Sequence, residues 1–82
     1  MNEAPDQTAR LQSMLATEGA GADLRRIVSD LRLRYPQVQN AELENYLIGA
    51  YCPVVEQNAA RNDQQKQADV VRFATAITQI IY

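Results

Sequence analysis

Residue types that carry out chemistry are scarce in this sequence. The chain has 82 residues, with no histidine and a single cysteine, Cys52. Without histidine, the commonest general base and the commonest nitrogen ligand of zinc or haem iron are both missing, and one cysteine is too few for a structural metal site. Glu42 and Glu44 are two positions apart, so they point in different directions on a helix. We therefore expect no enzymatic activity, no metal and no cofactor.

Cys52 is followed by Pro53, and cysteine–proline pairs are known as haem-responsive elements in which the thiolate binds iron. Here no histidine exists to supply the second axial ligand. A lone cysteine on a helix that faces a core usually packs as a small apolar side chain, and this is the interpretation that we favour. The alternative is a redox-sensing or small-ligand protein that uses Cys52, for example through reversible oxidation between two chains.

Several arginines fall on one predicted helix and raise the question of nucleic-acid binding. Asp23 and Asp30 lie among them at spacings that allow pairing along the helix, and the net charge is −2. No lysine or arginine occurs from residue 35 to residue 60, so the following helix would repel a phosphate backbone. The sequence therefore argues against a nucleic-acid partner and favours a solvated, salt-paired surface. These arginines are Arg25, Arg26, Arg32 and Arg34.

The elements that must position these residues are all predicted to be helices. Apolar residues recur at helical spacing over three main helices, at residues 23–35, 41–58 and 63–81, and nothing alternates with the period of a strand. A short N-terminal helix carries only a narrow apolar stripe and is expected to be a loosely packed helix or arm within residues 1–18. The sequence thus predicts a single all-α domain over residues 1–82, a small helical bundle of three main helices plus the N-terminal one.

Helix ends are indicated by capping residues and by proline. Asp23, Asn40 and Asn62 are placed to cap the three main helices, and Gln65 completes a capping box with Asn62. The glycines within residues 19–22 are expected to end the first helix in the left-handed cap conformation.

Pro53 raises the question of whether the third helix is interrupted. Apolar residues keep their helical spacing past Pro53. The carbonyl that the proline ring would crowd belongs to Gly49, which is the smallest residue available. We therefore predict one helix that is kinked at Pro53 and continues to about Asn58.

The third helix is apolar around more of its circumference than one core face needs. Ile48, Tyr51 and Val55 widen its main stripe, and Leu33 is an apolar residue among arginines on the preceding helix. Such a helix is either central in its bundle or in contact with a second chain. We take these four residues as a candidate interaction surface, for a protein partner or a second copy of the chain. The function expected from the sequence is a non-enzymatic protein-interaction or structural module.

The sequence gives little information on location. Its longest uncharged stretch within the middle of the chain, from Asn45 to Val55, is too short to span a membrane, which takes about 20 residues. Residues 1–10 do not resemble a signal peptide, and cytoplasm and periplasm both stay open. High alanine, glutamine and arginine content with little lysine suggests a bacterial source.

Overall fold

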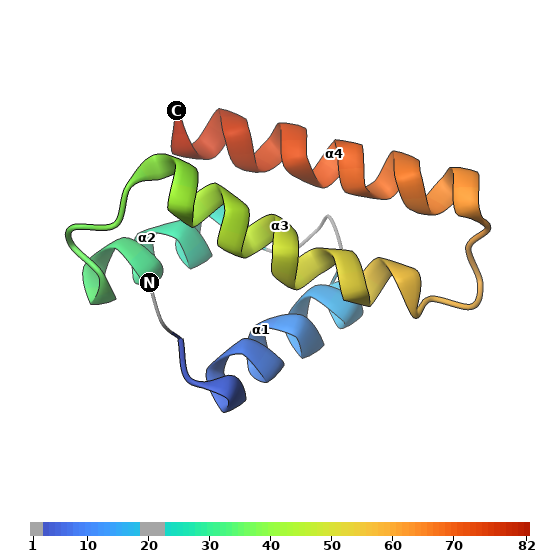
Figure 1. Ribbon diagram of the computed structural model, residues 1–82, viewed down its shortest axis with the longest axis horizontal. Coiled ribbons are helices and arrows are strands. Elements are labelled where there is room, and N and C mark those ends of the chain that lie inside the picture. Colours follow the sequence, from blue (N-terminus) through green and yellow to red (C-terminus); the bar gives the residue numbers. More distant parts are fainter. Residues whose placement is uncertain (1–2, 19–22) are drawn as a thin grey trace.

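The described part of the chain consists of α-helices joined by short loops. A computed structural model describes residues 3–18 and 23–82, and within them there are four α-helices and no strand, so the predicted all-α class is confirmed (Figure 1). The helices are α1 (Pro5–Glu18), α2 (Leu24–Arg34), α3 (Asn40–Glu56) and α4 (Asp63–Ile81). The last helix has the predicted bounds, and the other ends differ from prediction by one or two residues.

Helices α3 and α4 form an antiparallel pair. The Thr78 hydroxyl of α4 donates a hydrogen bond of 2.9 Å to the Glu44 carboxylate near the start of α3. Further along, the ring of Tyr51 on α3 stacks on that of Phe73 on α4, with centroids 4.1 Å apart and planes at 18°. The two helices lie side by side over most of their length in Figure 1.

Helix α1 lies on the other side of α3 and runs parallel to it. The hydroxyls of Thr8 and Tyr46 lie 3.0 Å apart, and the Gln12 side-chain amide donates to the Ala50 carbonyl at 3.3 Å. Leu15 is the only buried residue of α1. It is 1% exposed, so the N-terminal helix is anchored in the core, although by one side chain.

The core is apolar throughout and all four helices contribute to it. No polar or charged residue is buried among those that the structure describes. Helix α3 supplies five buried residues, α2 and α4 three each, and α1 one, so α3 is the central helix of the bundle. The buried residues are Leu15, Leu24, Val28, Leu31, Leu43, Leu47, Ala50, Tyr51, Val55, Phe73, Ile77 and Ile81.

Two of the three predicted N-caps are confirmed. The Asp23 carboxylate accepts a hydrogen bond of 3.2 Å from the backbone N–H of Arg26 at the start of α2. At α4, Asn62 and Gln65 form the reciprocal capping box, with bonds of 2.8 and 3.0 Å. Each cap satisfies N–H groups that the first turn of a helix leaves without partners. The predicted glycine cap after α1 lies outside the described residues.

The predicted cap of α3 is wrong. Helix α3 begins at Asn40 itself, its N-cap is Gln39, and no side chain bonds to the first turn there. The side-chain oxygen of Asn40 instead accepts a hydrogen bond of 3.0 Å from the Arg32 guanidinium, which also donates to the Ile81 carbonyl at 3.3 Å. Because a tertiary donor engages it, the asparagine joins α2 to α3 and, through Arg32, to the end of α4.

Helix α3 continues through Pro53 as a single element, as predicted, and ends at Glu56, two residues before the predicted end. Gly49, one turn before the proline, is exposed, and a side chain added there meets no atom within 4 Å. The structure therefore leaves room for a larger residue at the position where the sequence suggested that glycine relieves crowding.

Replacing Gly49 with alanine should stabilise the protein by about 1 kcal/mol, because glycine loses more backbone entropy than alanine in a helix interior. The measurement is the free energy of unfolding from urea titration followed by circular dichroism. A decrease in stability would show instead that the turn before Pro53 requires glycine.

Candidate interaction face

Two of the residues that the sequence placed on an interaction surface are core residues. Tyr51 is 8% exposed and Val55 is 4% exposed, so neither is available to a partner on the surface of the folded chain. The expectation of an exposed Tyr51 and Val55 is corrected accordingly: the wide apolar arc of α3 arises because this helix packs against α1 on one side and α4 on another.

The Tyr51 ring is buried through its stacking on Phe73. This burial raises the pKa of its hydroxyl, and the nearby Asp69 carboxylate acts in the same direction. The Asp69 carboxylate itself accepts hydrogen bonds from Nε and Nη2 of Arg61, at 3.0 and 2.8 Å, and these bonds lower the pKa of the Asp69 carboxyl. The loop between α3 and α4 is thereby fixed to the first half of α4.

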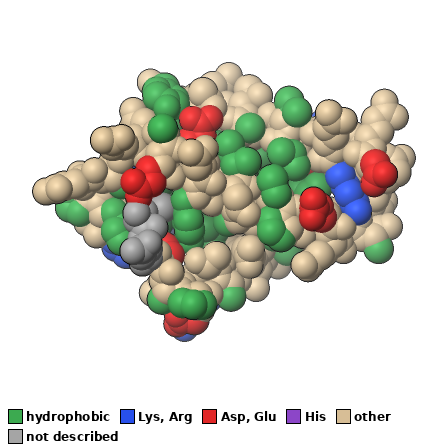
Figure 2. Space-filling view, in the orientation of Figure 1, with side chains coloured by type: hydrophobic (Ala, Val, Ile, Leu, Met, Phe, Trp, Pro, Cys, Tyr) green, Lys and Arg blue, Asp and Glu red, His purple; other side chains and the backbone are tan. Residues whose placement is uncertain are grey.

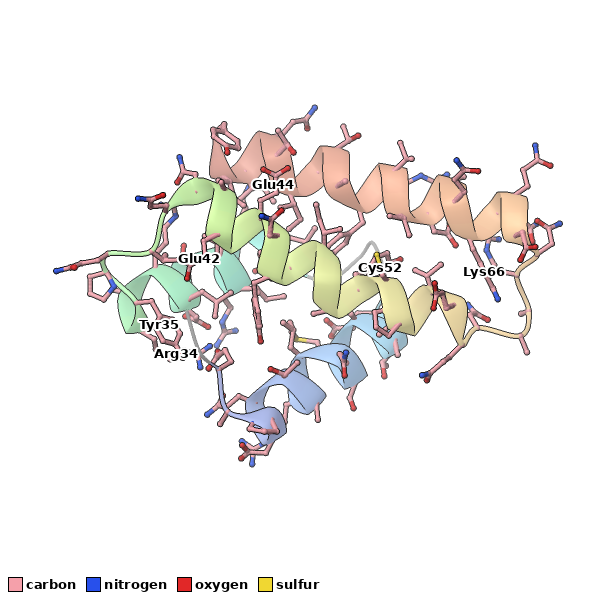
Figure 3. All side chains as sticks on the ribbon, in the orientation of Figure 1. Arg34, Tyr35, Glu42, Glu44, Cys52 and Lys66 are labelled. Carbon is pink, nitrogen blue, oxygen red and sulfur yellow. The ribbon has the colours of Figure 1, made fainter. Side chains whose placement is uncertain are left out.

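The other two predicted surface residues lie on different helices. Leu33 on α2 is 79% exposed, whereas Ile48 on α3 is half-buried and packs against the core. Cys52 on α3 is also half-buried, and Figure 3 shows it in the space between the α3 and α4 ribbons in that view. The four residues of the predicted surface therefore do not form one exposed patch.

An exposed stripe that the sequence analysis did not identify runs along α4. Its members follow one another at alternating spacings of four and three residues, the spacing of a helix face that packs on another helix. All of them are exposed, with Val71 at 58% and Tyr82 at 69%. We call this stripe the α4 outer face; it consists of Gln64, Ala68, Val71, Thr75, Thr78 and Tyr82.

The two threonine hydroxyls of the α4 outer face are engaged within the chain. The Thr75 hydroxyl donates to the Val71 carbonyl at 2.9 Å, and the Thr78 hydroxyl is bonded to both the Ala74 carbonyl and the Glu44 carboxylate. Hydroxyl protons that already have acceptors add little cost when a surface is removed from water. The threonines can therefore be covered at low cost.

Helix α4 contributes no charged residue of its own to the second half of this face, although the Glu44 carboxylate of α3 lies on Thr78 there. After Arg72 the sequence contains no charged residue up to Tyr82. Figure 2 shows hydrophobic side chains gathered over α3 at the centre of the molecule, and Figure 3 labels Glu44 beside the C-terminal half of α4. An exposed helix face without charge is unusual, because charged residues commonly cover the solvent side of a surface helix.

The sequence contains a signal for this face. Thr75 and Gln79 lie on the polar side of the last helix, and both are exposed. Val71 interrupts this polar side, and Thr75, Thr78 and Tyr82 continue its spacing.

Two of the arginines of α2 make tertiary contacts. Arg32 is bonded to the Asn40 side chain and the Ile81 carbonyl, and Arg34 pairs with Glu3 at 2.8 Å. Arg34 thus pairs with the segment before α1. The spacing of charges within α2 did not indicate this partner.

Two kinds of feature, a cluster of metal ligands and a membrane-spanning helix, are absent from the described residues. They contain no group of three cysteine, aspartate or glutamate side chains placed to hold a metal ion. None of their helices is both long enough and apolar enough to cross a membrane. Comparison of the chain with protein-family models, with curated proteins and with solved structures gives no significant match.

Proposed function

We propose that this chain is a non-enzymatic helical interaction module that pairs with a second copy of itself through the α4 outer face. The observation that supports this most directly is the exposure of Val71 at 58% and Tyr82 at 69% on one stripe with helix-packing spacing. Between them, Thr75 and Thr78 expose side chains whose hydroxyls already have acceptors within the chain. Such a face loses little by leaving water.

A second copy is favoured as the partner because of the charge distribution. Two-fold pairing brings each part of a face against the same face of the other copy, so like charges would oppose one another wherever the face is charged. From residue 73 to residue 82 the helix has no charge, and the whole chain has a net charge of only −2. Self-association over this half of α4 therefore brings together no charge of α4 itself, and only the Glu44 carboxylate of α3, which accepts from Thr78, lies at this part of the face.

The small size of the domain supports the same proposal. A chain of about this length buries only about 60% of its unfolded surface, so pairing would add apolar burial that a single copy lacks.

The bend that the sequence predicts at Pro53 also remains a prediction. It would shape the α3 side of the bundle without altering the α4 outer face.

The experiment is light scattering on a sizing column over a wide range of protein concentration, with and without reductant. We expect the mass to rise from that of the 9.2 kDa chain to twice that value as concentration increases, equally in both conditions. Equal behaviour is expected because the α4 outer face contains no cysteine.

A monomer at every concentration would contradict self-association. A dimer seen only without reductant would instead favour the alternative function, in which Cys52 acts as a redox-sensing residue.

A further inference from the structure

The segment before α1 contacts the end of α2 through both carboxylate oxygens of one residue, Glu3. The Glu3 side chain is 5% exposed, although it precedes the helix and lies near the start of the chain. One carboxylate oxygen pairs with Arg34 Nη1 at 2.8 Å, and the other accepts a hydrogen bond of 2.8 Å from the Tyr35 hydroxyl. Figure 3 labels Arg34 and Tyr35 where α2 ends beside this segment.

We propose that Glu3 is a latch that holds α1 closed against α2 and that its release allows α1 to open while the other helices stay folded. The contact joins residues 31 and 32 positions apart in the sequence, so it ties two elements that are not neighbours through local structure. We call the Glu3, Arg34 and Tyr35 contact the Glu3 latch.

The receiving side of the latch is rigid. Arg34 is the last residue of α2 and Tyr35 is its C-cap, whose backbone N–H donates to the Leu31 carbonyl at 2.8 Å. The Tyr35 carbonyl accepts from Val38 at 3.0 Å. These backbone bonds fix the two residues beside each other, so the carboxylate meets donors from adjacent positions, and Arg34 Nη1 also donates to the Gln7 side chain of α1 at 3.2 Å.

The helix that the latch holds has the fewest buried residues of the four. Leu15 is its one buried residue, whereas α2 and α4 have three each and α3 has five. Local opening occurs first where few apolar side chains are buried. A contact at the N-terminal end of α1, far along the helix from Leu15, therefore adds restraint where packing is weakest.

A groove lies beneath the latch and would be exposed when it opens. It has a volume of about 210 Å³ between α1 and α2, and Glu3 and Arg34 form part of its rim. Its apolar lining residues are Leu11, Met14, Ile27 and Leu31. Release of Glu3 thus uncovers apolar side chains of both helices. The Glu3 latch therefore controls whether these side chains are exposed to solvent.

The test is amide hydrogen exchange of the full chain, comparing Glu3→Gln with the matched control Glu18→Gln. Both changes remove one negative charge, but Glu18 is exposed at the far end of α1. We expect exchange of the α1 amides to rise about fivefold in Glu3→Gln, because a charge-assisted hydrogen-bonded pair is lost. Exchange of the α4 amides, and all exchange in Glu18→Gln, should stay close to that of the unmodified chain.

A second variant separates a latch from general destabilisation. Tyr35→Phe removes one of the two bonds and should raise α1 exchange less than Glu3→Gln does. Added to Glu3→Gln, it should raise exchange by less than it does in the unmodified chain, because the glutamine amide oxygen accepts the Tyr35 hydroxyl more weakly than the carboxylate does. Unchanged α1 exchange in Glu3→Gln, or an equal rise in all four helices, would overturn the proposal.

Discussion

Replacing Tyr51 with alanine is expected to destabilise the protein by about 3–5 kcal/mol, the range for truncating a large aromatic residue in a core. The Tyr51 ring is 8% exposed and stacks on Phe73, so alanine loses both the apolar burial and the aromatic contact between α3 and α4. Because small domains have limited stability, we expect much of this variant to be unfolded at room temperature. Urea titration followed by circular dichroism measures the effect.

Two matched variants show whether the loss of stability depends on the aromatic ring and on the buried position of Tyr51. Tyr51→Phe retains the ring and should change stability by less than about 1.5 kcal/mol, as isosteric core changes do. Leu33→Ala, at a residue that is 79% exposed, should change it by less than about 0.5 kcal/mol. If Tyr51→Ala were as stable as the unmodified chain, Tyr51 would belong to the surface that the sequence first suggested.

The Thr75→Glu variant is expected to remain monomeric at concentrations where the unmodified chain pairs. Thr75 lies at the middle of the uncharged half of the α4 outer face, and two-fold pairing brings the introduced charge in twice. Since opposed like charges in an interface cost several kcal/mol, the association constant should fall at least about a hundredfold. Light scattering over the same concentration range, with circular dichroism to show that α4 remains helical, provides the measurement.

The control places the same charge elsewhere on the surface. Ser29→Glu, on the exposed side of α2, adds one negative charge and should leave pairing unchanged. Leu33→Glu examines the surface residue that the sequence suggested on that helix. Loss of pairing in Leu33→Glu but not in Thr75→Glu would move the interface to α2.

Local features of the sequence were sufficient for the secondary structure. The bounds of α4 and the caps at Asp23 and Asn62 follow from apolar spacing and from short side chains that bond to the next turn. The continuity of α3 through Pro53 also followed from the sequence, because apolar residues have the same helical spacing before and after the proline. These features depend on residues within one or two turns, which is why the linear sequence contains the information.

Features that depend on distant residues were not available in the sequence. Asn40 has the side chain of a cap, but a tertiary bond from Arg32 engages it. Glu3 meets Arg34 and Tyr35 because the bundle brings the start of the chain to the end of α2. Nothing in the spacing of these residues indicates the contact.

The sequence by itself determined that this chain is helical and where its helices lie, and it contains no histidine and a single cysteine. The tertiary structure alone decided which apolar residues are exposed. Tyr51 and Val71 are both apolar positions on helices, yet the first is covered by a neighbouring helix and the second is 58% exposed. The physical reason is that periodicity defines the faces of a helix, whereas burial depends on how many neighbours pack around it.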